Sequence, residues 1–216
     1  MNAEFARRQM VEQQIRTFEV SDANVLEVLC ELPREDFVPL GFRDLAFADT
    51  PIPLKHGQSM MTPTVEGRLL QMLTLKPDDH VLEIGTGSGF LCACLARLSR
   101  SVISVDIFPD FTEGAGVILR NLGIENVILN TMDGTRELPD GKFDAIAVTG
   151  SCPIFDDRFF DALNPAGRLF IITGSAPVMD AQLVVRGSSG EREATSVFDT
   201  SVKPLVNAKA PPAFRF

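Results

Sequence analysis

Hydrophobic and polar positions divide the chain into a helical beginning, an irregular stretch and a longer regular part. Residues 3–17 and 21–31 repeat apolar side chains at helical spacing, which predicts two amphipathic helices. Ser21 or Asp22 is a suitable N-cap for the second helix. Residues 33–63 are rich in proline and glycine, so we expect irregular structure there. A breaker-rich stretch of about thirty residues in a compact domain is typical of a lid or a binding wall.

After residue 63, short apolar segments alternate with helical ones. The predicted strands are His80–Ile84, Val102–Asp106, Val127–Asn130, Phe143–Val148 and Leu169–Thr173. The predicted helices cover Val65–Leu73, the segment from the glycine-rich loop to Leu98, Phe111–Leu122 and a region near Phe155–Leu163. This alternation predicts an α/β fold: a Rossmann-like, doubly wound, mainly parallel sheet with helices on both faces. Gln182–Arg186 and Thr195–Val202 flank a turn of glycine and serine, which predicts an antiparallel hairpin at the C-terminal edge of the sheet.

Composition and charge narrow the functional classes. The chain has 216 residues, 45% of them hydrophobic and 23% charged, as expected of one globular domain with a real core. Its net charge of −9 disfavours general binding to nucleic acid or to an anionic membrane. The first fourteen residues lack the apolar core of a secretion signal. The four cysteines are too few for a disulfide framework and give no metal-ligand pattern. We therefore expect a cytoplasmic protein without a metal site, a nucleic-acid partner or a membrane partner.

The most informative segment joins a strand to a helix through glycines. Gly85, Gly87 and Gly89 form the pattern G-x-G-x-G, in which the third glycine comes one position earlier than in a dinucleotide-binding loop. Glu83 precedes the turn, and Asp106 ends the next strand. Because the carboxyl ends of parallel strands meet at one edge of a sheet, these groups should lie around a common nucleotide-like ligand.

This pattern resembles the first motif of the class I methyltransferases, which bind S-adenosylmethionine. The resemblance implies that the acid of Glu83 suits the cationic sulfonium end of that ligand, that Asp106 accepts hydrogen bonds from the ribose hydroxyls, and that Asp133 binds the adenine amino group. Thr149 would line the methionine end. The expected cofactor-binding residues are Glu83, Gly85, Thr86, Gly87, Ser88, Gly89, Asp106, Ile107, Asp133, Gly134 and Thr149.

Several further segments resemble one family of these enzymes, the protein-L-isoaspartate O-methyltransferases. They are Leu32–Pro39, Ala46–Asp49, His56–Gln58, Leu75–Pro77, Asn164–Leu169 and Val202–Leu205. The resemblance extends in register from about Met10 to Leu205. It implies repair of aged proteins, in which the abnormal carboxylate of an isoaspartyl residue is methylated. The partner would be a protein or peptide that carries isoaspartate.

The resemblance also implies a division of labour along the chain. We expect one methyltransferase domain over residues 1–216. Residues 1–63 would form N-terminal helices and a loop that covers the substrate, 64–175 the cofactor-binding core, and 176–216 C-terminal strands and a tail. The expected substrate-binding residues are Asp49, His56, Gln58, Val202 and Pro204.

One position departs from the family pattern. The family carries a serine beside the reacting groups, and Met61 stands in its place. Methionine donates no hydrogen bond, so no catalytic residue is assigned, and Ser59 and Thr62 are the nearby candidates. The chemistry itself needs no general base, because a carboxylic acid with a pKa of about 4 is already ionised at neutral pH. The small number of histidines, two in the chain, therefore does not count against this reaction.

Two other functions stay open. Met61 could mark a methyltransferase with a different acceptor, or the chain could be a non-catalytic protein that binds S-adenosylmethionine as a sensor or scaffold. An RNA methyltransferase is disfavoured by the net charge of −9. Cys152 has no visible base that would make it a nucleophile. Lys203 is either a contact for a substrate carboxylate or a solvated lysine.

Overall fold

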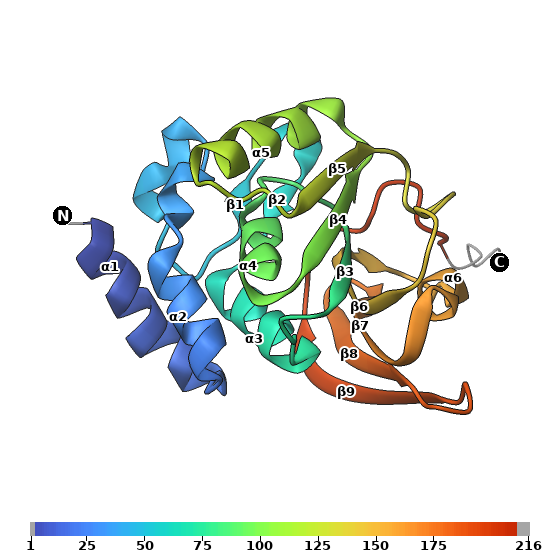
Figure 1. The fold of residues 1–216 in the computed structure, drawn as a ribbon. Helices are drawn as coiled ribbons and strands as arrows, with labels where there is room; N and C mark the ends of the chain where they lie inside the picture. The colour runs from blue at the N-terminus through green and yellow to red at the C-terminus, as the bar shows by residue number, and fades with distance from the viewer. Residues whose placement is uncertain (1–2, 211–216) are drawn as a thin grey trace, which may run out of the picture.

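A seven-stranded sheet lies at the centre of the computed structural model, which describes residues 3–210 (Figure 1). Its strands run in the order β5-β4-β3-β6-β7-β8-β9. The parallel part consists of β3 (His80–Ile84), β4 (Ser101–Asp106), β5 (Val127–Thr131), β6 (Phe143–Cys152) and β7 (Leu163–Ser175). The antiparallel edge consists of β8 (Val178–Arg186) and β9 (Arg192–Thr200). The predicted α/β fold with an antiparallel C-terminal hairpin is confirmed.

Alternate residues of the central strands face two separate hydrophobic cores. In β6, Ala145 and Ala147 belong to one core, whereas Ile146 and Val148 belong to the other. This follows from the two-residue period of a strand, which sends successive side chains to opposite faces. A continuous apolar run such as this one indicates a strand that is buried on both faces.

Helices cover the two faces unequally. The first core is covered by α2 (Ala23–Glu31), α3 (Pro63–Leu73), α4 (Phe90–Leu98) and α5 (Pro109–Asn121). The second core is covered by the short α6 (Asp157–Asp161), whose Phe159 and Phe160 are buried (Figure 1). None of the helices among the described residues is long and apolar enough to cross a membrane.

The N-terminal region is helical as predicted but changes its winding. Helix α1 (Ala3–Met10) continues as a π-helix over Val11–Ile15 and a 3₁₀ turn over Arg16–Phe18. Asp22 is the N-cap of α2, because its side chain accepts hydrogen bonds from the backbone amides of Asn24 and Val25. The predicted helix over residues 3–17 is thus one continuous helical segment that widens over Val11–Ile15 and tightens again over Arg16–Phe18.

The stretch from residue 33 to 63 contains a small sheet that the sequence did not predict. Strand β1 (Ile52–Pro53) pairs antiparallel with β2 (Ser59–Met60), and 3₁₀ turns occupy Arg34–Asp36, Leu40–Leu45 and Lys55–Gly57. Each strand has two residues, too few for an alternating pattern to be visible. This small sheet places the residues that precede α3 beside the carboxyl ends of the central strands.

Two predicted boundaries after β6 are wrong. The helix expected near residues 155–163 is confined to α6, and the strand expected over residues 169–173 begins earlier, at Leu163, in β7. Residue 163 pairs with Phe143, so sheet pairing takes over where helical spacing alone favoured a helix. Residues 1–2 and 211–216, which the expected domain also includes, lie outside the described residues.

Candidate functional site

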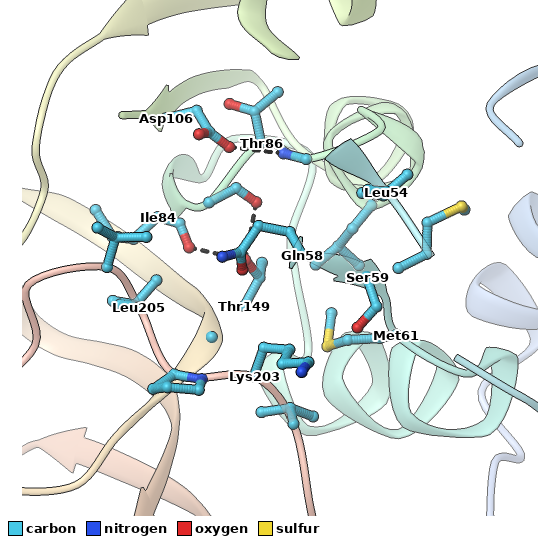
Figure 2. Close-up of a pocket in the computed structure, with 18 of the residues that line it drawn as sticks. Leu54, Gln58, Ser59, Met61, Ile84, Thr86, Asp106, Thr149, Lys203 and Leu205 are labelled. Atoms are coloured by element: carbon cyan, nitrogen blue, oxygen red, sulfur yellow. Dashed lines mark hydrogen bonds between the residues drawn. The ribbon is translucent and has the colours of Figure 1, made fainter. Parts of the chain in front are cut away.

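A cavity of about 540 Å³ opens at the carboxyl ends of the parallel strands (Figure 2). Its walls come from the ends of β3, β4 and β6, from residues of the 51–62 segment and from the chain after β9. Strand β3 lies between β4 and β6, so the cavity sits where the strand order reverses. Open α/β sheets bind their ligands at this point, and the volume is in the range of a small-molecule site.

The glycine turn between β3 and α4 forms one wall of the cavity. Gly85 has a φ of +102°, and a Cβ atom there would lie 2.2 Å from the hydroxyl oxygen of Thr149. That hydroxyl donates to the backbone oxygens of Ile84 and Gly85 at 2.9 and 2.8 Å, as the dashed lines in Figure 2 show. Only glycine fits both the conformation and the close approach at Gly85. The end of β6 therefore clamps the turn in place.

Asp106 fastens the glycine turn to the end of β4. One of its carboxylate oxygens accepts a hydrogen bond from the amide of Gly87 at 2.9 Å, and the other accepts from the amide of Phe108 at 3.0 Å. Burial raises the pKa of Asp106, and the two backbone hydrogen bonds act in the opposite direction. A carboxylate has about four acceptor positions, so this side chain can still accept hydrogen bonds from a ligand in the cavity.

Glu83 is a buried carboxyl group at the site with one unsatisfied oxygen. The residue is fully buried in β3 and lines the cavity. The hydroxyl of Ser104 donates to its Oε2 atom, and the thiol of Cys92 lies close by, whereas Oε1 has no hydrogen-bond partner among the described residues. Burial raises the pKa of Glu83 to about 8. An unpartnered buried carboxyl oxygen costs free energy unless a ligand supplies a donor or a positive charge.

Asp133 follows β5, lines the cavity and already makes several hydrogen bonds and an ion pair. Its carboxylate accepts hydrogen bonds from Thr135 and Asn207, and it forms an ion pair with Arg136 at 3.2 Å. Burial acts to raise the pKa of Asp133, but these hydrogen bonds outweigh it and hold the pKa below its usual value. Asp133 is therefore ionised, and its predicted contact with an adenine amino group would add to the contacts it already makes.

A buried ion pair, which the sequence analysis did not predict, stabilises the cavity wall that contains Met61. Arg34 pairs with Glu66 of α3 and donates to the backbone oxygens of Ala46 and Met61 at 3.0 and 2.9 Å. Its guanidinium also lies 4.6 Å from the ring centroid of Phe90. Burial raises the pKa of Glu66 to about 7, although the neighbouring guanidinium lowers it. The pair thus joins α3 to the segment that carries Met61.

Met61 and its neighbours Ser59 and Thr62 differ in whether their side chains already make hydrogen bonds. Met61 is buried and lines the cavity. Thr62 serves as the N-cap of α3 and hydrogen-bonds to Thr64, so its hydroxyl is already engaged. Ser59 also lines the cavity, and its hydroxyl makes no hydrogen bond to another described residue. Figure 2 shows the ends of Ser59, Met61 and Lys203 turned toward the same part of the cavity.

Most of the predicted residues meet at this cavity. All of the predicted cofactor residues except Gly89 line it, and so do the predicted substrate residues Gln58, Val202 and Pro204. Gly89 instead allows α4 to approach α5, because a Cβ atom there would lie 2.6 Å from the Cβ of Ala115.

Two predicted substrate residues lie outside the cavity lining. Asp49 accepts hydrogen bonds from the amide and hydroxyl of Thr64 and so caps the start of α3. His56 stacks on Phe108, with ring centroids 4.0 Å apart, and its Nε2 atom lies 2.9 Å from a carboxylate oxygen of Asp110. Both residues support the walls, and neither forms them.

Comparisons with known proteins agree on one family. The model of the protein-L-isoaspartate(D-aspartate) O-methyltransferase family matches residues 5–210. Proteins named protein-L-isoaspartate O-methyltransferase from Koribacter versatilis and Brucella anthropi are 34% and 35% identical to the chain. The first alignment covers 93% of this chain and 90% of the relative, and the second covers 98% of each.

A solved structure shows the same fold. A putative protein-L-isoaspartate O-methyltransferase from Plasmodium falciparum, in complex with S-adenosyl-L-homocysteine, superposes with a TM-score of 0.80. The superposition covers 92% of this chain and 97% of that one, at 20% identity. This likeness concerns the arrangement of the strands and helices.

Proposed function

The chain belongs to the protein-L-isoaspartate(D-aspartate) O-methyltransferase family, and from this membership we propose that it methylates the carboxylate of isoaspartyl residues in damaged proteins. S-adenosylmethionine would be the methyl donor. The related structure from Plasmodium falciparum was solved with the demethylated form of this molecule. A protein or peptide that carries isoaspartate would be the partner, and the cytoplasm remains the expected compartment.

The observation that carries the proposal is the unpartnered Oε1 atom of Glu83. Glu83 lines a cavity large enough for a nucleoside, beside a glycine turn and the carboxylate of Asp106. A cationic ligand group would satisfy this oxygen and would favour the ionised form of a carboxyl whose pKa is otherwise raised. A dinucleotide with its anionic pyrophosphate would meet repulsion here, whereas a ligand with a sulfonium and an ammonium group fits the donor set.

We assign the ligand contacts as follows. Glu83 would hold the cationic end, Asp106 the ribose hydroxyls and Asp133 the adenine amino group. Gly85 and Gly87 let the backbone approach the ligand, and Thr149 keeps the turn closed at the methionine end. When bound, S-adenosylmethionine supplies an electrophilic methyl group.

The chain's own residues would act by binding, orienting and excluding water. The acceptor carboxylate needs no base, so the task is to hold one of its oxygens in line with the methyl group. Met61, Val65 and Leu205 give the cavity apolar surface, which removes water from around the acceptor. The Arg34–Glu66 pair fixes the backbone of Met61 and so positions this wall.

This assignment also gives each of three segments of the chain a separate function. We propose that residues 1–63 cover the acceptor, that 64–175 hold the cofactor and that 176–216 complete the acceptor site. The first and last of these segments support the division, because residues 51–62 and 200–206 contribute to the cavity walls.

Methyl transfer to a peptide pair tests the proposal. The protein is incubated with S-adenosylmethionine labelled in its methyl group and with an isoaspartyl peptide or its aspartyl counterpart. We expect label in the isoaspartyl peptide alone, as an ester that base hydrolyses. Background label in both peptides would refute the acceptor assignment. Met61 favours a methyltransferase with a different acceptor as the second candidate, and label in a small carboxylic acid with none in the peptide would establish it.

A further inference from the structure

Lys203 is the sole cationic side chain among the residues that line the cavity. The same lining contains four acidic side chains, Glu66, Glu83, Asp106 and Asp133. None of these four groups carries a positive charge that would attract an incoming carboxylate. The ammonium group of Lys203 makes no hydrogen bond or ion pair with another described residue. It is a free positive charge at the place where a negative acceptor has to be accommodated.

The backbone around Lys203 is held firmly against the sheet. The amide of Ser151 in β6 donates to the backbone oxygen of Lys203 at 2.9 Å, and the amide of Leu205 donates to the oxygen of Ser151 at 3.0 Å. Leu205 packs so tightly on Gly150 that a Cβ atom there would lie 2.8 Å from a Leu205 methyl group. The starting point of the lysine side chain is thus fixed by the end of β6, while its long stem stays adaptable.

The side chain of Lys203 points toward the position at which the family has a serine and this chain has Met61. In Figure 2 the end of Lys203 points toward Ser59 and Met61, away from the turn that carries Asp106. Because Met61 stands in place of the family serine, this part of the cavity lacks the hydrogen-bond donor that the serine would provide. Ser59 and Lys203 both carry hydrogen-bond donors here, and neither side chain donates to another described residue.

We propose that Lys203 is the specificity-determining residue that binds the acceptor carboxylate and compensates for Met61. This inference rests on the proposed function. Lys203 holds one carboxylate oxygen and leaves the other free to attack. Methyl transfer forms an oxygen–carbon bond at the free oxygen and breaks the sulfur–carbon bond of the donor, with the electron pair left on sulfur and no proton moved. The product is a neutral ester, which an ammonium group holds more weakly than a carboxylate, so release of product is favoured.

The test compares Lys203→Gln with Lys203→Arg and with a control, Lys76→Gln. Lys76 is exposed, precedes β3 at the end of the strand away from the cavity, and its ammonium group has no partner among the described residues. We expect Lys203→Gln to raise the KM for an isoaspartyl peptide about tenfold, with a smaller change in kcat. Lys203→Arg should restore most of the loss, and Lys76→Gln should behave as the parent protein.

Binding provides a readout that is independent of turnover. Fluorescence anisotropy of a dye-labelled isoaspartyl peptide, with S-adenosylhomocysteine present, gives the Kd of the peptide and of its methyl ester. The parent protein should bind the carboxylate more tightly than the ester, and Lys203→Gln should remove most of that preference. The affinity for S-adenosylmethionine should stay within about twofold in every variant, because Lys203 lies outside the predicted cofactor contacts.

The outcomes separate the two proposals. If the parent protein methylates the peptide and Lys203→Gln does so with the same KM and the same preference for carboxylate, the role of Lys203 is refuted and the proposed function stands. If Lys203→Gln also loses S-adenosylmethionine, the residue supports the fold of the segment, and the inference is refuted as well. If the parent protein neither binds nor methylates isoaspartyl peptides, both proposals fail.

Discussion

At the scale of single residues, Glu83 is the group whose removal says most about the site. Its Oε1 atom has no hydrogen-bond partner within residues 3–210, and its Oε2 atom accepts from Ser104. Glu83→Gln keeps the shape but cannot carry negative charge. A hydrogen bond to a charged group contributes about 1.5–3 kcal/mol, so we expect S-adenosylmethionine to bind roughly 10- to 100-fold more weakly. Isothermal calorimetry measures this, and an unchanged Kd would show that the cationic end of the ligand lies elsewhere.

The raised pKa of Glu83 has a consequence for stability. Burial raises it from 4.5 to about 8, so between these values the folded protein keeps a proton that the unfolded chain has lost. This contribution to stability is complete below pH 4.5 and is lost as the pH rises toward 8. Glu66, raised from 4.5 to about 7 by burial, acts in the same direction. The melting temperature of the ligand-free protein should therefore fall from pH 5 to pH 8.

Circular dichroism is the suitable probe for this pH dependence, because the chain has neither Trp nor Tyr. Glu83→Gln should melt with a shallower dependence on pH than the parent protein, since glutamine does not titrate. An exposed acid such as Glu113, for which the same substitution should leave the slope unchanged, is the control. Parallel slopes for parent and Glu83→Gln would mean that the carboxyl is ionised in the folded protein throughout this range.

Met61→Ser tests the departure from the family pattern. The substitution replaces a buried apolar side chain that lines the cavity with a small hydroxyl. We expect more isoaspartyl methylation, with a lower KM, because a hydrogen-bond donor returns beside the acceptor. Some loss of stability, about 1–3 kcal/mol, should accompany it, since the smaller side chain leaves space in the wall. Methylation assays with Met60→Ser as the neighbouring control check this, and activity that stays the same would show that the site is already complete.

The predicted cofactor residues that line the cavity share one property: they lie at or just after the ends of strands of the parallel sheet. Glu83 and Asp106 follow from the rule that parallel strands end at the same edge. Arg34 and Glu66 are 32 positions apart and come from a 3₁₀ turn and a helix. No local pattern joins such a pair, and only the packed structure shows it.

At the scale of elements, the Arg34–Glu66 pair joins α3 to the segment around Met61. Both side chains are buried, and Arg34 holds two backbone oxygens in addition. Arg34→Met would leave Glu66 and these oxygens without their partner, so we expect a loss of about 3–5 kcal/mol in the free energy of unfolding. Urea unfolding followed by circular dichroism measures it.

A matched control and a double variant sharpen this prediction. Arg16 pairs with Glu12 at 2.7 Å on the surface, so Arg16→Met should cost less than about 1 kcal/mol. Arg34→Met combined with Glu66→Leu removes the buried charge altogether and should regain part of the loss. If Arg34→Met were as mild as the surface variant, the pair would not be what fixes this wall.

The accuracy of the predicted elements follows their length and setting. Strand β3 has the predicted bounds because its short run, with the apolar residues Val81, Leu82 and Ile84, ends at a glycine turn. Strands β1 and β2 have two residues each and contain Pro53, so neither the period nor the composition indicated a strand. The long β7 begins early because Leu163 pairs with Phe143 of β6, and such tertiary pairing is invisible in a local window.

At the scale of the whole molecule, the net charge of −9 sets which damaged proteins approach the cavity most readily. The field of this charge extends about 10 Å at 0.1 M salt. Isoaspartyl peptides with lysine beside the damaged residue should therefore have a lower KM than peptides with glutamate there. We expect a difference of at least about threefold at low salt, and a smaller difference at high salt.

This preference is separable from the contact with the acceptor carboxylate. A charge spread over the molecule acts on the flanking residues of the peptide, whereas Lys203 acts on the group that receives the methyl. Lys203→Gln should therefore raise the KM of both peptides and leave their ratio nearly unchanged. Steady-state assays of the two peptides at several salt concentrations, with parent protein and variant side by side, decide the matter. A ratio that salt does not alter would mean that the flanking residues are recognised by shape or by local contacts, and the net charge would then have no part in selecting the substrate.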